Sequence, residues 1–356
     1  MVFFIAALVL VIFKKMEFAK ENTFFQNEYI DKSTTNAVNG IFVILIVFSH
    51  YVQYANFHGI FDEPYLVLRE HLNQMVVASF LFYSGYGMME SFRKNGKWYL
   101  KKIPSKFITL LLRFDIAVCL FGILGKVLDL GIDYNLKLIF LSLIGWKNLG
   151  NSSWYIFVIL VMYIYISFQG LRYSEKTAMY FLSAIALSIL TASFVFFMIK
   201  CDLDRYWYDT AMLLPCGMFY SLFKDRIESI IMRSDGLFFA WCILFSVIYI
   251  VMYFHRFDYG IEGYTIWAMS FIALVLLATM KIKIGNPVLS WFGKHIFSIY
   301  ILQRIPMIIL SHYGFVENHR YMCLILVLIT TAWMVVVFEY ITDKIINIPQ
   351  RLRRQN

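Results

Sequence analysis

Long apolar runs dominate the chain and limit what it can fold into. Only 15% of the 356 residues are charged, whereas soluble domains carry about a quarter. A helix satisfies its own backbone hydrogen bonds in the hydrocarbon core, so runs of roughly 20 apolar residues predict membrane spans. The sequence therefore predicts an all-α, polytopic membrane helical bundle with about ten core helices. We expect the spans near residues 36–55, 75–92, 107–128, 152–169, 177–199, 208–222, 236–254, 261–280, 288–310 and 321–343.

The runs divide the chain into three regions. Residues 1–32 form an apolar segment and a basic linker, residues 33–345 the membrane domain, and residues 346–356 a basic cytoplasmic tail. The apolar stretch 1–13 is shorter than a span, no basic region precedes it and no small-residue cleavage site follows, which argues against a signal peptide. An additional short helix and a misplaced start both remain open. Within the segment 129–151, residues 136–144 are expected to form a short interfacial or re-entrant helix.

Positive charge gathers in short loops, which predicts the orientation of the chain. Cytoplasmic loops carry an excess of Lys and Arg, and the loop 93–106 holds six such residues and no acid. This rule places loops 93–106, 170–176, 223–235, 281–286 and the C-terminal tail inside. It places loops 56–74, 200–207, 255–260 and 311–320 outside. The net charge of +9 is thus explained by topology, and we expect no nucleic-acid partner. The five cysteines show no metal-ligand spacing, so no metal is expected.

The first predicted span contains a histidine, His50, whose side chain can ionise. Such a residue inside a membrane is costly and is a functional-site hypothesis by default. Asn39 precedes it by eleven residues, or about three helical turns, so both share one face roughly 16 Å apart along the axis. The same face carries Asn36 at one end and Gln53 or Tyr54 at the other. A polar stripe of this kind faces protein or water rather than lipid.

Four motifs follow one another at characteristic spacings: Thr35 to His50, Phe80-Leu-Phe-Tyr-Ser84-Gly85-Tyr, Ser153-Trp154-Tyr155, and Phe292 to Gln303. In this order they resemble the acyltransferase-3 family of integral membrane acyltransferases, from about residue 33 to 345. Two positions depart from the family pattern. Asn39 stands where the family usually has Arg, and Gln303 stands where many members have His. Both replacements keep hydrogen-bonding capacity but lose charge.

The resemblance implies transfer of an acyl group, expected to be acetyl, from acyl-CoA to a hydroxyl of a cell-surface or lipid-linked carbohydrate. Acetyl-CoA would be a co-substrate rather than a tightly bound cofactor. His50 is the expected general base, and Asn39 would hold the donor or orient the site. Packing hydrogen bonds between helices are the alternative role of both residues. The implied setting is a bacterial inner or plasma membrane, with membrane lipid, acyl-CoA and a carbohydrate as partners.

Further site residues are expected at the span ends and in the basic loop. The substrate-binding candidates are Ser84, Trp154, Tyr155, Tyr300 and Gln303. Ser84 could instead serve close helix packing, and the aromatic residues could anchor the membrane interface. The candidates for the phosphates of coenzyme A are Arg93, Lys101, Lys102, Lys106 and Arg113. Their alternative role is topology alone. Arg113 and Asp115 do not face each other on a helix, so each needs another partner.

A transporter or flippase of a small solute or glycan intermediate is the alternative function. Ten helices with a polar stripe suit a transport path, but the sequence shows no internal repeat with paired broken helices. A different membrane acyltransferase family with an intramembrane His is a third possibility, and the Ser-Gly and late Tyr motifs fit it less well. The acceptor, the acyl group and the oligomeric state are not specified by the sequence.

Overall fold

The computed structural model describes residues 1–19, 25–26, 28–72, 74–169 and 177–352. The loop 170–176, predicted to be cytoplasmic, and residues 353–356 of the predicted tail lie outside this part of the chain. The described residues are predominantly helical, which confirms the all-α class. Six of the described helices are long and apolar enough to cross a membrane, and three further apolar helices are shorter. The chain is therefore a multi-pass membrane protein, but the count of ten core helices is not confirmed.

The predicted spans correspond to helices with altered bounds. The first helices are α1 (Val2–Phe13), α2 (Lys32–Tyr51), α3 (Glu63–Leu72), α4 (Met75–Val127), α5 (Leu136–Leu143), α6 (Trp154–Gln169) and α7 (Thr177–Lys200). A short 3-10 turn, η1 (Arg205–Trp207), precedes α8 (Leu213–Ile231), α9 (Asp235–His255) and α10 (Gly260–Lys281). The last helices are α11 (Pro287–Lys294), α12 (Ile296–Leu302), α13 (Arg304–His312) and α14 (Phe315–Leu352).

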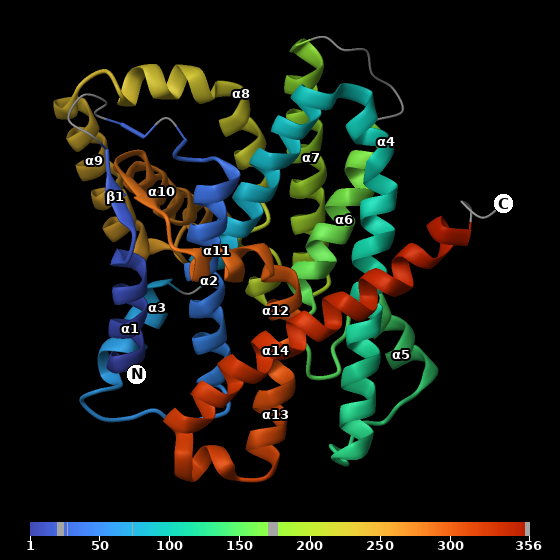
Figure 1. Cartoon of the computed structure of the whole chain (residues 1–356). Helices are drawn as coiled ribbons and strands as arrows, with labels where there is room; N and C mark the ends of the chain where they lie inside the picture. Colours follow the sequence, from blue (N-terminus) through green and yellow to red (C-terminus); the bar gives the residue numbers. More distant parts are fainter. Residues whose placement is uncertain (20–24, 27, 73, 170–176, 353–356) are drawn as a thin grey trace.

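The basic segment 93–106 is helical, and its prediction as a loop was wrong. It joins two predicted spans within α4, and the break between them is Gly96, whose φ of 52° and ψ of −137° depart from helical geometry. Glycine adopts positive φ without the steric cost of a side chain, so the chain can turn there while its neighbours stay helical. Figure 1 shows this turn at the top, where the ribbon of α4 reverses direction.

The predicted span 288–310 is broken into three short helices, α11, α12 and α13. The breaks fall at His295, which has φ −108° and ψ 20°, and at Gln303. Polar residues stand at both breaks, with Lys294 before His295 and Arg304 after Gln303, but mean hydropathy over the whole run does not register them. The predicted span 208–222 begins later, at Leu213, and its helix continues to Ile231. The predicted tail is helical as far as Leu352, within α14.

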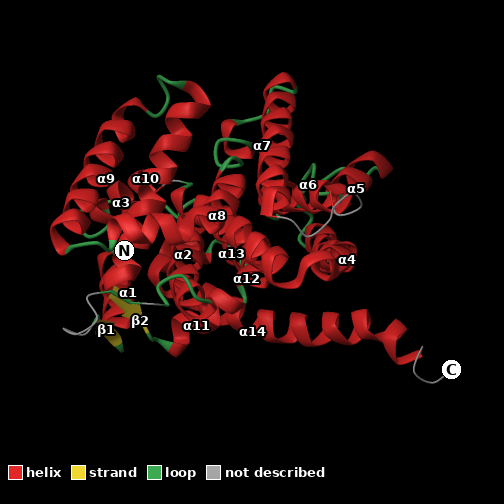
Figure 2. Cartoon of the chain, turned by 90° about the horizontal axis from the view of Figure 1, so that it is seen from above, coloured by secondary structure: helices red, strands yellow, loops and turns green. Residues whose placement is uncertain are grey.

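A short two-stranded sheet and the long last helix complete the described fold. The strands β1 (Met16–Phe18) and β2 (Ile282–Ile284) pair antiparallel and tie the N-terminal segment to the end of α10. The helix α14 crosses α12 obliquely and lies along one edge of the bundle (Figures 1 and 2). Together, α2, the broken α11–α13 segment and α14 enclose one of two apolar cores, and α4 and α6 to α10 build most of the other.

Candidate functional site

A cavity of about 820 Å³ lies beside His50. It is bounded by the last turns of α2, by α3, by the segment 148–154, by η1 and by the junction of α12 and α13. On the predicted orientation, this is the external half of the protein. Its lining is mostly polar or aromatic and comprises Ile46, Ser49, His50, Gln53, Tyr54, Leu66, Arg69, Glu70, Gln74, Val76, Val77, Asn148, Gly150, Asn151, Ser152, Ser153, Trp154, Tyr206, Trp207, Tyr300 and Arg304.

The imidazole of His50 lies beside α12. Its ring centroid lies 6.1 Å from that of Tyr300, and the ring of Tyr155 in turn lies 5.6 Å from that of Tyr300. The buried amide of Gln303 also interacts with His50. Among the described residues, the His50 Nδ1, the Tyr300 hydroxyl and the Gln303 Oε1 are buried without hydrogen-bond partners. Buried polar groups are normally satisfied, so this cluster has unused capacity for a ligand.

Close helix packing brings these residues together. A Cβ atom at Gly40 would overlap the carbonyl oxygen of Leu289, and one at Gly293 would overlap the carbonyl oxygen of Asn36. Helices with glycine at the contact approach closely because no side chain separates their backbones. The crossing of α2 with α11 therefore fixes where α12 begins. It is α12 that carries Tyr300 to the cavity end of α2.

Two arginines from different elements line the same cavity. The Arg69 Nε on α3 donates to the Ser49 hydroxyl at 3.0 Å. The Arg304 Nε at the start of α13 donates to the Ser152 hydroxyl at 2.9 Å, and its Nη1 donates to the Tyr54 hydroxyl at 3.2 Å. Both side chains are partly buried. Both add positive charge near His50.

Aromatic rings form a second wall of the cavity. The ring of Tyr206 lies 6.2 Å from Trp154 and 6.2 Å from Trp207. Asn151, whose Oδ1 accepts a hydrogen bond from the Leu149 amide, folds the preceding loop against this wall. Aromatic faces with a few fixed polar groups are typical of small-molecule sites.

The structure places the predicted substrate residues at different depths. Trp154 and Tyr300 line the cavity, the ring of Tyr155 meets that of Tyr300 edge to face, and Gln303 is fully buried. Ser84 does not line it, although its side chain interacts with Tyr155. A Cβ atom at the neighbouring Gly85 would overlap the carbonyl oxygen of Leu214. The Ser-Gly motif therefore sits at a close crossing of α4 with α8.

Asn39 lies three turns from His50 and does not line the cavity. Its Oδ1 is buried and has no hydrogen-bond partner among the described residues. It shares this property with the His50 Nδ1 at the other end of the stripe. The structure thus separates the two predicted catalytic residues along α2.

The predicted coenzyme A residues lie around the Gly96 turn, apart from one. Arg93 pairs with Glu90 at 3.0 Å, Lys101 is exposed, and the Lys102 and Lys106 ammonium groups lie over the rings of Trp98 and Tyr99. Arg113 instead forms an ion pair with Asp343 of α14. Its charge is therefore compensated within the protein, away from the other four cations.

Sequence reasoning missed a polar cluster between α11, α12 and α14. The Glu339 carboxylate contacts the His295 Nδ1 at 2.7 Å and accepts a hydrogen bond from the Ser298 hydroxyl at 2.6 Å. It also missed Arg69 and Arg304 at the cavity. Arg304 falls inside the predicted span 288–310, so the cost of an intramembrane charge was a signal for it.

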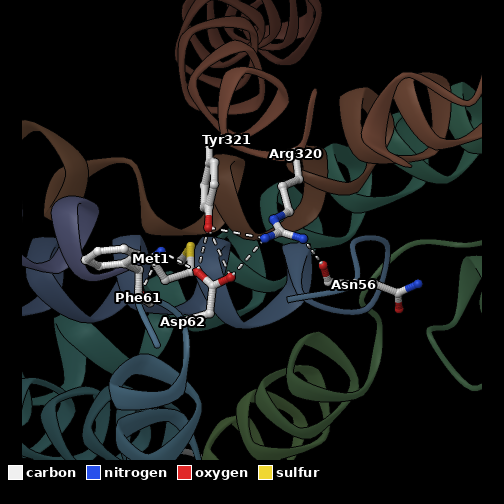
Figure 3. A network of polar contacts seen from close by, with 6 residues as sticks. All are labelled: Met1, Asn56, Phe61, Asp62, Arg320 and Tyr321. Carbon is white, nitrogen blue, oxygen red and sulfur yellow. Dashed lines mark hydrogen bonds and ion pairs between the residues drawn. The ribbon is translucent and has the colours of Figure 1, made fainter. Parts of the chain in front are cut away.

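A second polar network holds the segment that precedes α3 (Figure 3). The Asp62 carboxylate accepts from the Met1 ammonium at 2.6 Å, the Tyr321 hydroxyl at 2.9 Å and the Arg320 guanidinium at 3.3 Å. Burial by itself raises the pKa of Asp62, but these hydrogen bonds and the two positive charges hold the pKa below its ordinary value. The network joins the start of α3, and so Arg69, to α14.

The described residues contain no group of three or more His, Cys, Asp or Glu side chains that could hold a metal ion. In a comparison with known protein families, residues 35–339 match the model of a family described as an acyltransferase domain. No curated protein and no solved structure matches the chain.

Proposed function

Because the chain belongs to the acyltransferase-3 family, we propose that it transfers an acetyl group from acetyl-CoA to a hydroxyl of a cell-envelope carbohydrate. The observation that carries this proposal is the position of His50. It lies in a membrane helix and at the wall of a polar cavity that opens beside Tyr300 and Arg304. A packing histidine would need no such cavity.

The proposed chemistry is a balanced acyl transfer. His50 removes the proton of the acceptor hydroxyl as that oxygen attacks the acyl carbonyl carbon, since histidine is the usual base near neutral pH. A carbon–oxygen bond forms, the carbon–sulfur bond breaks, and the released thiolate of coenzyme A takes up a proton. The Tyr300 hydroxyl, which has no partner among the described residues, is placed to donate to the developing oxyanion.

The shape of the cavity supports a carbohydrate acceptor. Trp154, Tyr206 and Trp207 offer aromatic faces, and Asn148, Asn151 and Ser153 offer polar groups. A sugar ring presents both apolar C–H faces and hydroxyls, and a wall of aromatic faces with fixed polar groups complements both. A solute transporter alternates between a state open to one side of the membrane and a state open to the other. Many transporters build these two states from an internal repeat, and this sequence shows no such repeat.

The donor is proposed to arrive from the opposite face. Arg93, Lys101, Lys102 and Lys106 gather at the α4 turn, which the charge rule places in the cytoplasm, and cations there attract the phosphates of acetyl-CoA. Asn39 lies between this side and His50, so its unpartnered amide oxygen is proposed to position the donor. The setting proposed is a bacterial cell membrane.

The test compares the O-acyl content of surface glycans in three strains. These are a deletion, the deletion restored with the natural protein, and the deletion restored with His50→Ala at matched expression. We expect the natural protein to restore an acyl ester and His50→Ala to leave it absent. Restoration by both proteins would contradict the role of His50. A deletion that changes no acyl ester would favour a transporter.

A further inference from the structure

The two cavity arginines differ from other arginines of the described chain in their partners. Five others form an ion pair with a carboxylate, namely Arg93, Arg113, Arg205, Arg256 and Arg320, and Arg226 and Arg233 are exposed to solvent. Arg69 and Arg304 pair with no carboxylate among the described residues and donate only to hydroxyl groups. Both lie in a partly buried cavity where charge is poorly screened by water.

The acid that lines the same cavity does not compensate them. The Glu70 carboxylate accepts a hydrogen bond from the Tyr253 hydroxyl at 3.0 Å and lies 3.9 Å from the Arg256 guanidinium. A partly buried cation is costly unless it is paired and hydrogen-bonded. Two such cations facing one cavity therefore favour an anion from outside the chain.

Their side chains are also held in place before any ligand binds. Arg304 is fixed by Ser152 on one side and by Tyr54 on the other, and Arg69 is fixed by Ser49. A guanidinium carries five N–H donors in a rigid fork that matches carboxylate and phosphate oxygens. One or two donors of each group are used by these hydroxyls, which leaves the remainder for a ligand.

We propose that the carbohydrate acceptor carries an anionic group, a phosphate or a carboxylate, which Arg69 and Arg304 bind while a nearby hydroxyl reaches His50. This rests on the proposed function for the identity of the acceptor. The cavity lies on the face opposite the basic turn of α4, so the anion belongs to the acceptor and not to coenzyme A. Binding at two fixed guanidinium groups also orients the acceptor, which selects the hydroxyl that is acylated.

The test measures binding rather than turnover, so that it stands apart from the acyl-transfer test. Purified protein in lipid nanodiscs is titrated with glucose, glucose 1-phosphate and glucuronic acid, and binding is followed by ligand-observed NMR. We expect the phosphate or the carboxylate probe to bind about tenfold to a hundredfold more tightly than glucose, as hydrogen bonds to charged groups imply. Comparing the two charged probes identifies which anion the site prefers.

Three variants show whether the arginines carry this preference. Arg304→Gln and Arg69→Gln should each remove most of it, and Arg304→Lys should retain part, because the charge remains but the fork is lost. Lys147→Gln is the matched control, since this exposed cation on the loop before Asn148 does not line the cavity. It should leave the preference unchanged, and melting curves verify that each variant is folded.

The proposal is overturned if neither charged probe binds more tightly than glucose, or if both Gln variants keep the preference. A clear preference in a protein that transfers no acyl group would leave the anion site standing and overturn the proposed function. Acyl transfer that depends on His50, without any preference for charged probes, would leave the proposed function standing and overturn the anion site.

Discussion

At the scale of single residues, the site depends on neighbours that come from separate elements. His50 was predictable from the sequence because an ionisable side chain interrupts an apolar run. The residues that surround His50 were harder to predict. Tyr300 and Gln303 could be named only through motif resemblance, and nothing in the external segment marks Arg69 as a cavity residue. Long-range packing decides which polar groups meet, and hydropathy does not encode it.

Gln303 should affect activity more than stability. Its Oε1 is buried without a partner among the described residues, and its Nε2 donates a long hydrogen bond to the Tyr300 carbonyl at 3.3 Å. Gln303→Met therefore removes one unsatisfied group together with one weak hydrogen bond, and fills a similar volume. We expect acyl transfer to fall by about tenfold to a hundredfold, as misplacement of a catalytic group does, with the melting temperature unchanged. Initial rates and melting curves of the purified variant measure both. A large loss of stability at unchanged activity would contradict this role.

Asp62 should stabilise the protein in a pH-dependent way. The pKa of Asp62 in the folded state is lowered. Its contribution to the free energy of unfolding is therefore fully present above the ordinary pKa of an aspartate, and it is lost as the pH falls through the lowered pKa. Asp62→Asn should cost about 1.5–3 kcal/mol at neutral pH, because hydrogen bonds to a charged group are lost. In melting curves of both proteins between pH 7 and pH 3, the difference should narrow toward the acid end. A gap that stays constant over this range would contradict the account.

At the scale of elements, the site depends on how closely α2 approaches α11. The apolar run predicted a helix at 36–55, and α2 is found at Lys32–Tyr51. Its earlier start follows from Asp31, which caps the helix by accepting from the Thr34 amide. It predicted the 288–310 region poorly. The breaks at His295 and Gln303 coincide with the polar residues Lys294 and Arg304, which the expectation of one continuous span passed over.

Gly40→Ala should damage both the fold and the site. The added Cβ would overlap the Leu289 carbonyl oxygen and push α11 away from α2, and overpacking of this kind costs about 1–3 kcal/mol. The displacement would carry Tyr300 away from His50, so activity should fall as well. Gly87→Ala in α4 is the control, because a Cβ there meets no atom within 4 Å. Equal effects of the two substitutions on melting temperature and rate would show that the crossing has no special role.

At the scale of the whole molecule, the described chain separates two charged regions. The α4 turn carries the basic residues of segment 93–106 at one end, and the His50 cavity lies toward the other. The sequence predicted this polarity from loop charge, since Lys and Arg gather on one side. It did not predict that the basic segment is a helical turn at Gly96, because a positive φ at one glycine leaves no trace in hydropathy. A bundle with this polarity can take the donor and the acceptor from opposite sides.

Sided acyl transfer in reconstituted vesicles tests this account most directly. The protein is inserted in one orientation, labelled acetyl-CoA is supplied on the face of the α4 turn, and envelope glycan from the deletion strain is supplied on the face of the His50 cavity. The account predicts labelled ester on the glycan with the natural protein and none with His50→Ala. Equal labelling by His50→Ala, or labelling only when both substrates share one face, would contradict it.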